Sequence, residues 1–82
     1  MKNEEVVREK LAAIQACMAA GERAYDRMYD VRDRAELMWQ TEVATDAYRE
    51  AHRIADELGL REQASEIMDR LRHVKAVSRQ LS

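Results

Sequence analysis

The stretch GERAYDRMYDVRDRAELMWQTEVATDAYREAHRIADELG, residues 21–59, decides how this chain folds, because it lies between the only two glycines and contains no proline. Read as a helix with about 100° between successive residues, it changes its apolar face halfway along. The first half places five apolar side chains together on one side: Ala24, Met28, Val31, Ala35 and Met38. The second half places another five on a side roughly 160° away: Val43, Ala47, Ala51, Ile54 and Leu58. A helix with two opposed apolar faces must be covered from two directions.

The segments on either side of this stretch each carry a single apolar stripe at helical spacing. Before Gly21 the stripe consists of Val7, Leu11, Ile14 and Met18. After Gly59 it consists of Leu60, Ala64, Ile67, Leu71, Val74 and Leu81, interrupted at Ser78. Asn3 is suited to cap the first helix and Gly21 to end it. Gly59 is the better helix stop, because Leu60 behind it can pack back on Ala55 as in a Schellman ending.

The sequence therefore predicts an all-α fold, a small helical bundle of three helices in one domain over residues 1–82. The expected helices cover about 3–20, 22–58 and 60–80. The central segment is either one helix about 55 Å long or two helices with a break near residue 40. We favour the long helix, because Thr41 lacks the Glu or Gln at position 44 that a capping box requires.

Composition limits the classes of protein that this chain can belong to. A chain of 82 residues buries only about 60–65% of its unfolded surface, so we expect a homodimer to complete the bundle.

The net charge of −2 is too balanced to mark the whole chain as a nucleic-acid or membrane binder. The single Cys17 suits a reducing compartment, and the first residues do not resemble a signal peptide. We expect a soluble, cytoplasmic protein without membrane contact.

An aromatic strip is the most suggestive candidate site. On a continuous central helix, Tyr25, Tyr29 and Trp39 share an arc of about 80° with Arg32 and Glu36. Protein interfaces are enriched in Tyr, Trp, Met and Arg, and all four types concentrate between Arg23 and Trp39. The strip is either the contact between two copies of the chain or the contact with a foreign protein partner.

Two other groups of side chains suggest competing functions. The basic last helix could contact nucleic-acid phosphates through Arg70, Arg72, Lys75 and Arg79, although no aromatic side chains interleave with them. His52 with Asp56, and His73 with Asp69, could in principle supply metal ligands or an enzyme site. Neither pair matches a known metal-binding motif, and Cys17 has no basic neighbour that would activate it. We therefore expect no catalytic residue, no cofactor and no metal.

Ala44, Tyr48 and Ala51 carry a family resemblance. Their spacing is similar to the Ala, aromatic and Ala positions in the second helix of a tetratricopeptide repeat. The resemblance implies a helical protein-binding scaffold of a single repeat. The Trp, Leu-Gly, Tyr and Pro positions of the family would fall on non-matching residues: Met28, Val31 with Arg32, Ala35 and Asp56.

The function that we expect from the sequence is non-enzymatic protein binding, as an adaptor, regulator or inhibitor that acts through a helical surface. The first alternative is a small regulator associated with nucleic acid through the basic last helix. The second is a metal or enzyme site near the histidines.

Overall fold

The computed structural model describes residues 2–82, and these form three helices and no strand. Helix α1 spans Lys2–Met28, α2 spans Arg34–Glu57 and α3 spans Arg61–Leu81. The prediction of an all-α bundle of three helices is therefore confirmed.

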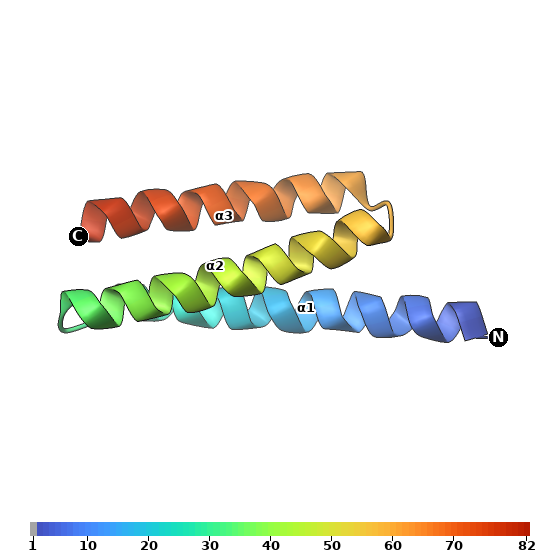
Figure 1. The fold of residues 1–82 in the computed structure, drawn as a ribbon, viewed down its shortest axis with the longest axis horizontal. Helices are drawn as coiled ribbons and strands as arrows, with labels where there is room; N and C mark the ends of the chain where they lie inside the picture. Colours follow the sequence, from blue (N-terminus) through green and yellow to red (C-terminus); the bar gives the residue numbers. More distant parts are fainter. Residues whose placement is uncertain (1) are drawn as a thin grey trace.

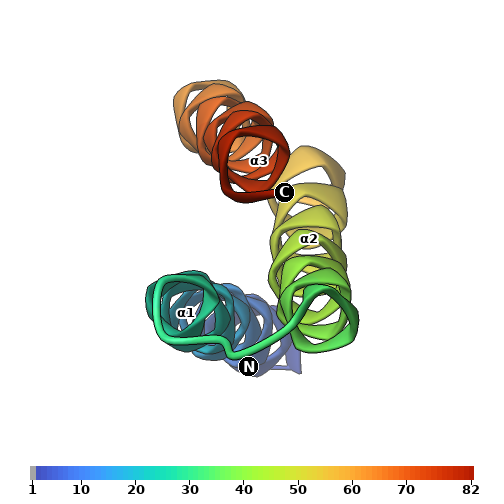
Figure 2. The same ribbon diagram turned by 90° about the vertical axis from the view of Figure 1, so that its left-hand side faces the viewer.

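Helix α2 lies between the other two, and both α1 and α3 pack against it (Figures 1 and 2). The molecule is elongated, with extents of 49 × 18 × 13 Å. The first turns of α1 project beyond the turn that joins α2 to α3 (Figure 1). An ion pair of 3.3 Å joins Lys10 of α1 to Glu57, the last residue of α2. The residues of α1 before Lys10 therefore lie beyond the end of α2.

The predicted helix boundaries at Gly21 and near residue 40 are wrong. Helix α1 continues through Gly21 to Met28, so no long helix covers 22–58. Gly21 is buried, and a Cβ atom added to it would lie 2.8 Å from Cε1 and Cζ of the Tyr48 ring. The glycine is therefore the place where the Tyr48 ring of α2 packs directly on the α1 backbone, rather than a helix terminator.

The chain breaks at residues 29–33 because Asp33 caps a new helix there. Asp33 has extended backbone angles (φ −146°, ψ 171°), and its Oδ1 accepts a hydrogen bond of 2.8 Å from the Glu36 backbone N–H. Glu36 Oε2 in turn accepts from the Arg32 backbone N–H at 3.2 Å. The two acidic side chains thus satisfy backbone donors on both sides of the helix start, in the manner of a capping box. Thr41 is not a cap, because its hydroxyl donates to the Leu37 carbonyl of the same helix.

This turn also explains why the apolar face changes halfway through residues 21–59. The first apolar group does not lie on one helix: Ala24 and Met28 belong to the end of α1, whereas Ala35 and Met38 belong to the start of α2. Ala24 and Met28 are buried, but Met38 is 58% exposed. A change of phase in the apolar pattern was therefore a sign of a chain reversal without glycine or proline.

The ending of α2 is a Schellman motif, as predicted. Gly59 has a φ of +74°, its N–H donates to Asp56 O at 3.0 Å, and the Leu60 N–H donates to Ala55 O at 2.9 Å. These two bonds satisfy carbonyls that the helix itself leaves free.

The core runs along both contacts of α2. Helix α3 buries Ala64, Ile67, Leu71, Val74 and Val77, whereas Leu81 is exposed, so the seam ends on Val77 rather than on Leu81. The polar residue Ser78 interrupts the apolar seam without loss of hydrogen bonding, because its hydroxyl lies 3.0 Å from the Thr41 hydroxyl, within hydrogen-bond distance.

Candidate protein-binding site

The five residues of the predicted aromatic strip are distributed over three parts of the chain. Tyr25 lies on α1, Tyr29 and Arg32 lie in the turn that follows α1, and Glu36 and Trp39 lie on α2. The prediction that they share one arc of one helix is wrong, because that helix ends at Met28. The structure instead separates them into two surfaces.

Tyr25 and Tyr29 form one surface, together with His73 of α3. The hydroxyl groups of Tyr25 and Tyr29 are 2.8 Å apart, and their rings meet edge to face with centroids 5.5 Å apart. The Tyr25 hydroxyl also lies 2.9 Å from Nε2 of His73. The hydrogen bond with Tyr29 is the main cause that raises the pKa of Tyr25 to about 12. Tyr25 therefore remains a neutral phenol at ordinary pH and links α1 to α3.

A shallow hollow lies beside this cluster, where α1 and α3 approach each other over α2. Its volume is about 210 Å³, and the lining side chains come from all three helices: Tyr25, Tyr48, Asp69, Arg70, His73 and Val74. An ion pair of 3.1 Å between Glu22 and Arg70 spans the same gap. Burial is the main cause that raises the pKa of Tyr48, so this phenol also stays neutral.

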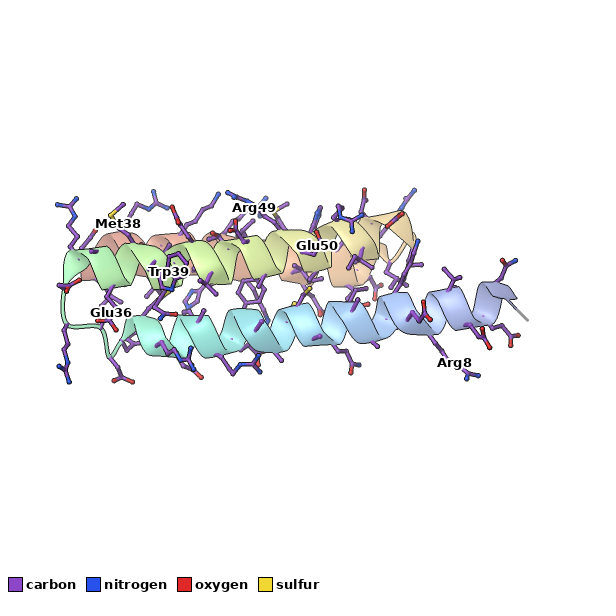
Figure 3. All side chains as sticks on the ribbon, turned by 60° about the horizontal axis from the view of Figure 1, so that its bottom comes forward. Arg8, Glu36, Met38, Trp39, Arg49 and Glu50 are labelled. Atoms are coloured by element: carbon purple, nitrogen blue, oxygen red, sulfur yellow. The ribbon has the colours of Figure 1, made fainter. Side chains whose placement is uncertain are left out.

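Trp39 and Met38 form the second surface, on the part of α2 that the other two helices leave exposed. Trp39 is 63% exposed and Met38 is 58% exposed, and Ala35 one turn earlier is exposed as well. In Figure 3, Trp39 lies on the edge of α2 beside α1, and Met38 points away from α1 at the other edge. Trp39 makes no aromatic contact or hydrogen bond with Tyr25 or Tyr29 among the described side chains. We call Ala35, Met38 and Trp39 the α2 patch.

Glu36 and Arg32 have structural contacts that the sequence did not lead us to expect. The carboxylate of Glu36 accepts from the Arg32 backbone N–H, so both residues help to form the start of α2. The motif Asp33-Arg34-Ala35-Glu36 has the spacing of a capping box and would have predicted this role.

The basic residues of α3 are largely engaged with neighbouring groups. Arg70 pairs with Glu22 at 3.1 Å, Arg72 pairs with Asp69 at 3.4 Å, and Arg79 Nε donates to the Lys75 carbonyl at 3.4 Å. A phosphate would have to compete with carboxylates for two of the four cationic side chains.

The two candidate His–Asp pairs lie on different helices, His52 with Asp56 on α2 and His73 with Asp69 on α3. His73 contacts Tyr25, and His52 lies half-buried on α2. No group of three or more His, Cys, Asp or Glu side chains within residues 2–82 is close enough to hold a metal ion. Cys17 is half-buried, and burial is the main cause that raises the pKa of its thiol. None of the three helices, over the part of the chain described, is apolar enough along its length to cross a membrane.

The three residues of the tetratricopeptide-like motif are all buried in the core: Ala44, Tyr48 and Ala51. The positions that would form the preceding helix of such a repeat do not do so, because Val31 and Arg32 lie in the turn between α1 and α2. Comparison with protein-family models, with curated proteins and with solved structures found no match to this chain. The function must therefore be inferred from the Tyr25–Tyr29 surface and the α2 patch.

Proposed function

We propose that this chain is a non-enzymatic protein-binding module, an adaptor, regulator or inhibitor, that contacts its partner through the α2 patch. The observation that carries the proposal is the exposure of Trp39 and Met38, two large apolar side chains at adjacent positions on a regular helix. Trp is the residue type most enriched at the energetic centres of protein interfaces, and Met is enriched at interfaces in general.

The fold does not need these two side chains. The buried residues of α2 lie elsewhere on the helix: Leu37, Ala44, Thr45, Tyr48, Ala51, Ile54 and Ala55. Trp39 and Met38 therefore contribute little to folding, although each keeps a large apolar side chain in water. Large exposed apolar side chains are typical of interaction surfaces. The patch belongs to a helix that is anchored on both sides, so binding a partner there requires little ordering of the chain.

The surroundings of the α2 patch indicate what a partner must offer. Glu42 lies on the same side of α2 one turn beyond Met38 and is exposed, and Asp46 follows after another turn. Asp46 is partly compensated by Arg49 at 3.8 Å, whereas no ion pair of the described side chains involves Glu42. We therefore expect a partner that places apolar side chains on Trp39 and Met38 and a basic side chain near Glu42.

Affinity capture from an extract of the native host, followed by mass spectrometry, tests this proposal. The wild-type chain is expected to retain a specific protein, and Trp39→Ala is expected to lose it while its circular dichroism remains helical. Arg72→Ala, an exposed change on α3, is the matched control and should retain the same protein. Retention by Trp39→Ala equal to that of the wild-type chain would contradict the assignment of the α2 patch.

Trp39 is also the only tryptophan, so its fluorescence reports on this surface directly. Once the captured protein has been purified, its addition should shift the emission to shorter wavelength, because the indole leaves water. Emission that does not change during binding would place the contact elsewhere on the molecule.

A further inference from the structure

The hollow beside Tyr25 is lined by buried and aromatic side chains from all three helices. Two of the lining residues belong to the core: Tyr48 is 2% exposed and Val74 is 1% exposed. The rings of Tyr25 and His73 line it as well, with centroids 5.5 Å apart and planes tilted by 45°. Apolar and aromatic walls with a few polar groups are typical of sites that bind small organic molecules.

The hydroxyl of Tyr48 is a polar group on a nearly buried residue that the protein leaves free. Of the described side chains, none forms a hydrogen bond with it. No fully buried side-chain oxygen in that part of the chain lacks a partner, so this hydroxyl must reach the surface, and Tyr48 lines the hollow. The Arg70 guanidinium lies near it without the geometry of a hydrogen bond, and partly offsets the rise in the pKa of Tyr48 that burial causes. At neutral pH the phenol therefore keeps its proton and can donate it to a ligand.

Gly21 fixes where this hydroxyl lies. A Cβ atom on Gly21 would lie 2.8 Å from Cζ of Tyr48, the ring carbon that bears the hydroxyl, and 3.0 Å from Cε2. The hydroxyl end of the ring therefore rests against the α1 backbone at Gly21, next to the residue that pairs with Arg70. Because a buried ring in contact with backbone is held in place, its hydrogen-bonding group is positioned before a ligand arrives, and less entropy is lost on binding.

Charge and size limit the class of ligand that fits. The two lining residues with full charges are already compensated, Arg70 by Glu22 at 3.1 Å and Asp69 by Arg72 at 3.4 Å. An uncharged ligand therefore disrupts no ion pair and needs no counter-charge. The volume of about 210 Å³ is below the roughly 300–1,000 Å³ of pockets for drug-sized molecules, so it suits a single ring.

We propose that the hollow binds a small, uncharged aromatic molecule of the phenol type, one ring that bears a hydroxyl or carbonyl oxygen. The ligand oxygen accepts a hydrogen bond from the Tyr48 hydroxyl, and the ligand ring packs on Val74 and on the rings of Tyr25 and His73. Tyr48 and Trp39 are nine residues apart on α2, so their side chains leave the helix in directions about 180° apart. The hollow and the α2 patch are therefore separate and can be tested separately.

A titration with p-cresol, followed by two-dimensional heteronuclear NMR, tests this site. We expect saturable shifts of backbone amides at the hollow, those of Tyr48, Arg70 and Val74 among them. The dissociation constant should be on the order of a millimolar, which is what about eight non-hydrogen atoms can supply. Shifts confined to another part of the molecule, or no saturable shift up to about 10 millimolar, would overturn the proposal.

Tyr48→Phe tests the hydrogen bond while the ring stays in place on Gly21. The variant should bind p-cresol about fivefold more weakly, but it should bind toluene, which lacks the hydroxyl, as the wild-type chain does. Tyr29→Phe is the matched control, because it removes a phenol hydroxyl that does not line the hollow, and its affinity for p-cresol should be unchanged. Circular dichroism and thermal unfolding of both variants should remain those of a folded helical chain. Wild-type affinity of Tyr48→Phe for p-cresol would contradict the assigned hydrogen bond.

Benzoate and benzylamine test the charge of the ligand. Each should bind more weakly than p-cresol, since each brings an uncompensated charge next to groups that are already paired. Equal or tighter binding of either compound would overturn the assignment of an uncharged ligand. Trp39→Ala should bind p-cresol as the wild-type chain does, and so separates a failure of this site from a failure of the proposed partner-binding function.

Discussion

Gly21 and Tyr48 show how one residue without a side chain can decide a helix contact. In an isolated helix, alanine in place of glycine is more stable by about 1 kcal/mol. In this chain the added Cβ would lie 2.8 Å from the buried Tyr48 ring, which cannot move without disturbing the core. We predict that Gly21→Ala lowers the free energy of unfolding by about 1–2 kcal/mol, measured by urea denaturation.

A double-mutant cycle separates this clash from other effects of the substitution. In a Tyr48→Leu background the shorter side chain leaves room for the new methyl group, so Gly21→Ala should become neutral or stabilising. The same loss of stability in both backgrounds would mean that the ring does not pack on Gly21.

Tyr25 gives a prediction about pH. Its pKa is about 12 in the folded chain, mainly because of the hydrogen bond with Tyr29, whereas a tyrosine in the unfolded chain ionises near 10. A raised folded pKa means that the folded state holds the proton longer, so the stabilisation is complete below pH 10. We expect it to be lost between about pH 10 and pH 12, and absorbance titration should show Tyr25 ionising late, as should Tyr48, whose pKa burial raises. In Tyr29→Phe, Tyr25 should titrate closer to 10, whereas Tyr48 should still ionise late.

At the scale of the elements, the start of α2 depends on Asp33. Its side chain accepts the Glu36 backbone N–H at 2.8 Å, and without it that donor is left to water. We predict that Asp33→Ala lowers the free energy of unfolding by about 0.5–2 kcal/mol. Asp30→Ala is a suitable control, because Asp30 is exposed in the same turn and makes no cap. Equal effects of the two changes would show that the cap is not what fixes this turn.

The seam of α3 gives a second prediction at this scale. Leu71 is 6% exposed and lies between Ile67 and Val74, which are also buried. Leu71→Ala should therefore lower the free energy of unfolding by about 2–5 kcal/mol, through lost burial and the cavity left behind. Thermal unfolding unchanged from the wild-type chain would mean that α3 does not pack on α2 in solution.

The sequence was sufficient to predict the class of fold, the ending of α2 and most of the α3 seam, because these depend on local spacing. It was not sufficient to place the reversal at residues 29–33. Gly21 has the chemistry of a helix terminator, and only a distant ring, that of Tyr48, makes a glycine necessary inside α1. The spacing of Asp33 and Glu36 could have predicted a helix start at this point. The absence of glycine and proline between Gly21 and Gly59 instead favoured a continuous helix.

At the scale of the whole molecule, the same turn divides the predicted aromatic strip. Tyr25 contacts both Tyr29 and His73 of α3, whereas Trp39 lies exposed on α2, at its edge beside α1 (Figure 3). Composition alone could predict that interface residues concentrate between Arg23 and Trp39. It could not predict that they form two surfaces, because that depends on where the chain reverses.

The central claim is that Trp39 serves binding rather than folding, and the free energy of unfolding of Trp39→Ala tests it most directly. Because the side chain is 63% exposed, urea denaturation should give a value within about 0.5 kcal/mol of the wild-type chain. A loss of about 3–5 kcal/mol, as expected for truncation of a buried aromatic side chain, would show that Trp39 belongs to the core and would contradict the account.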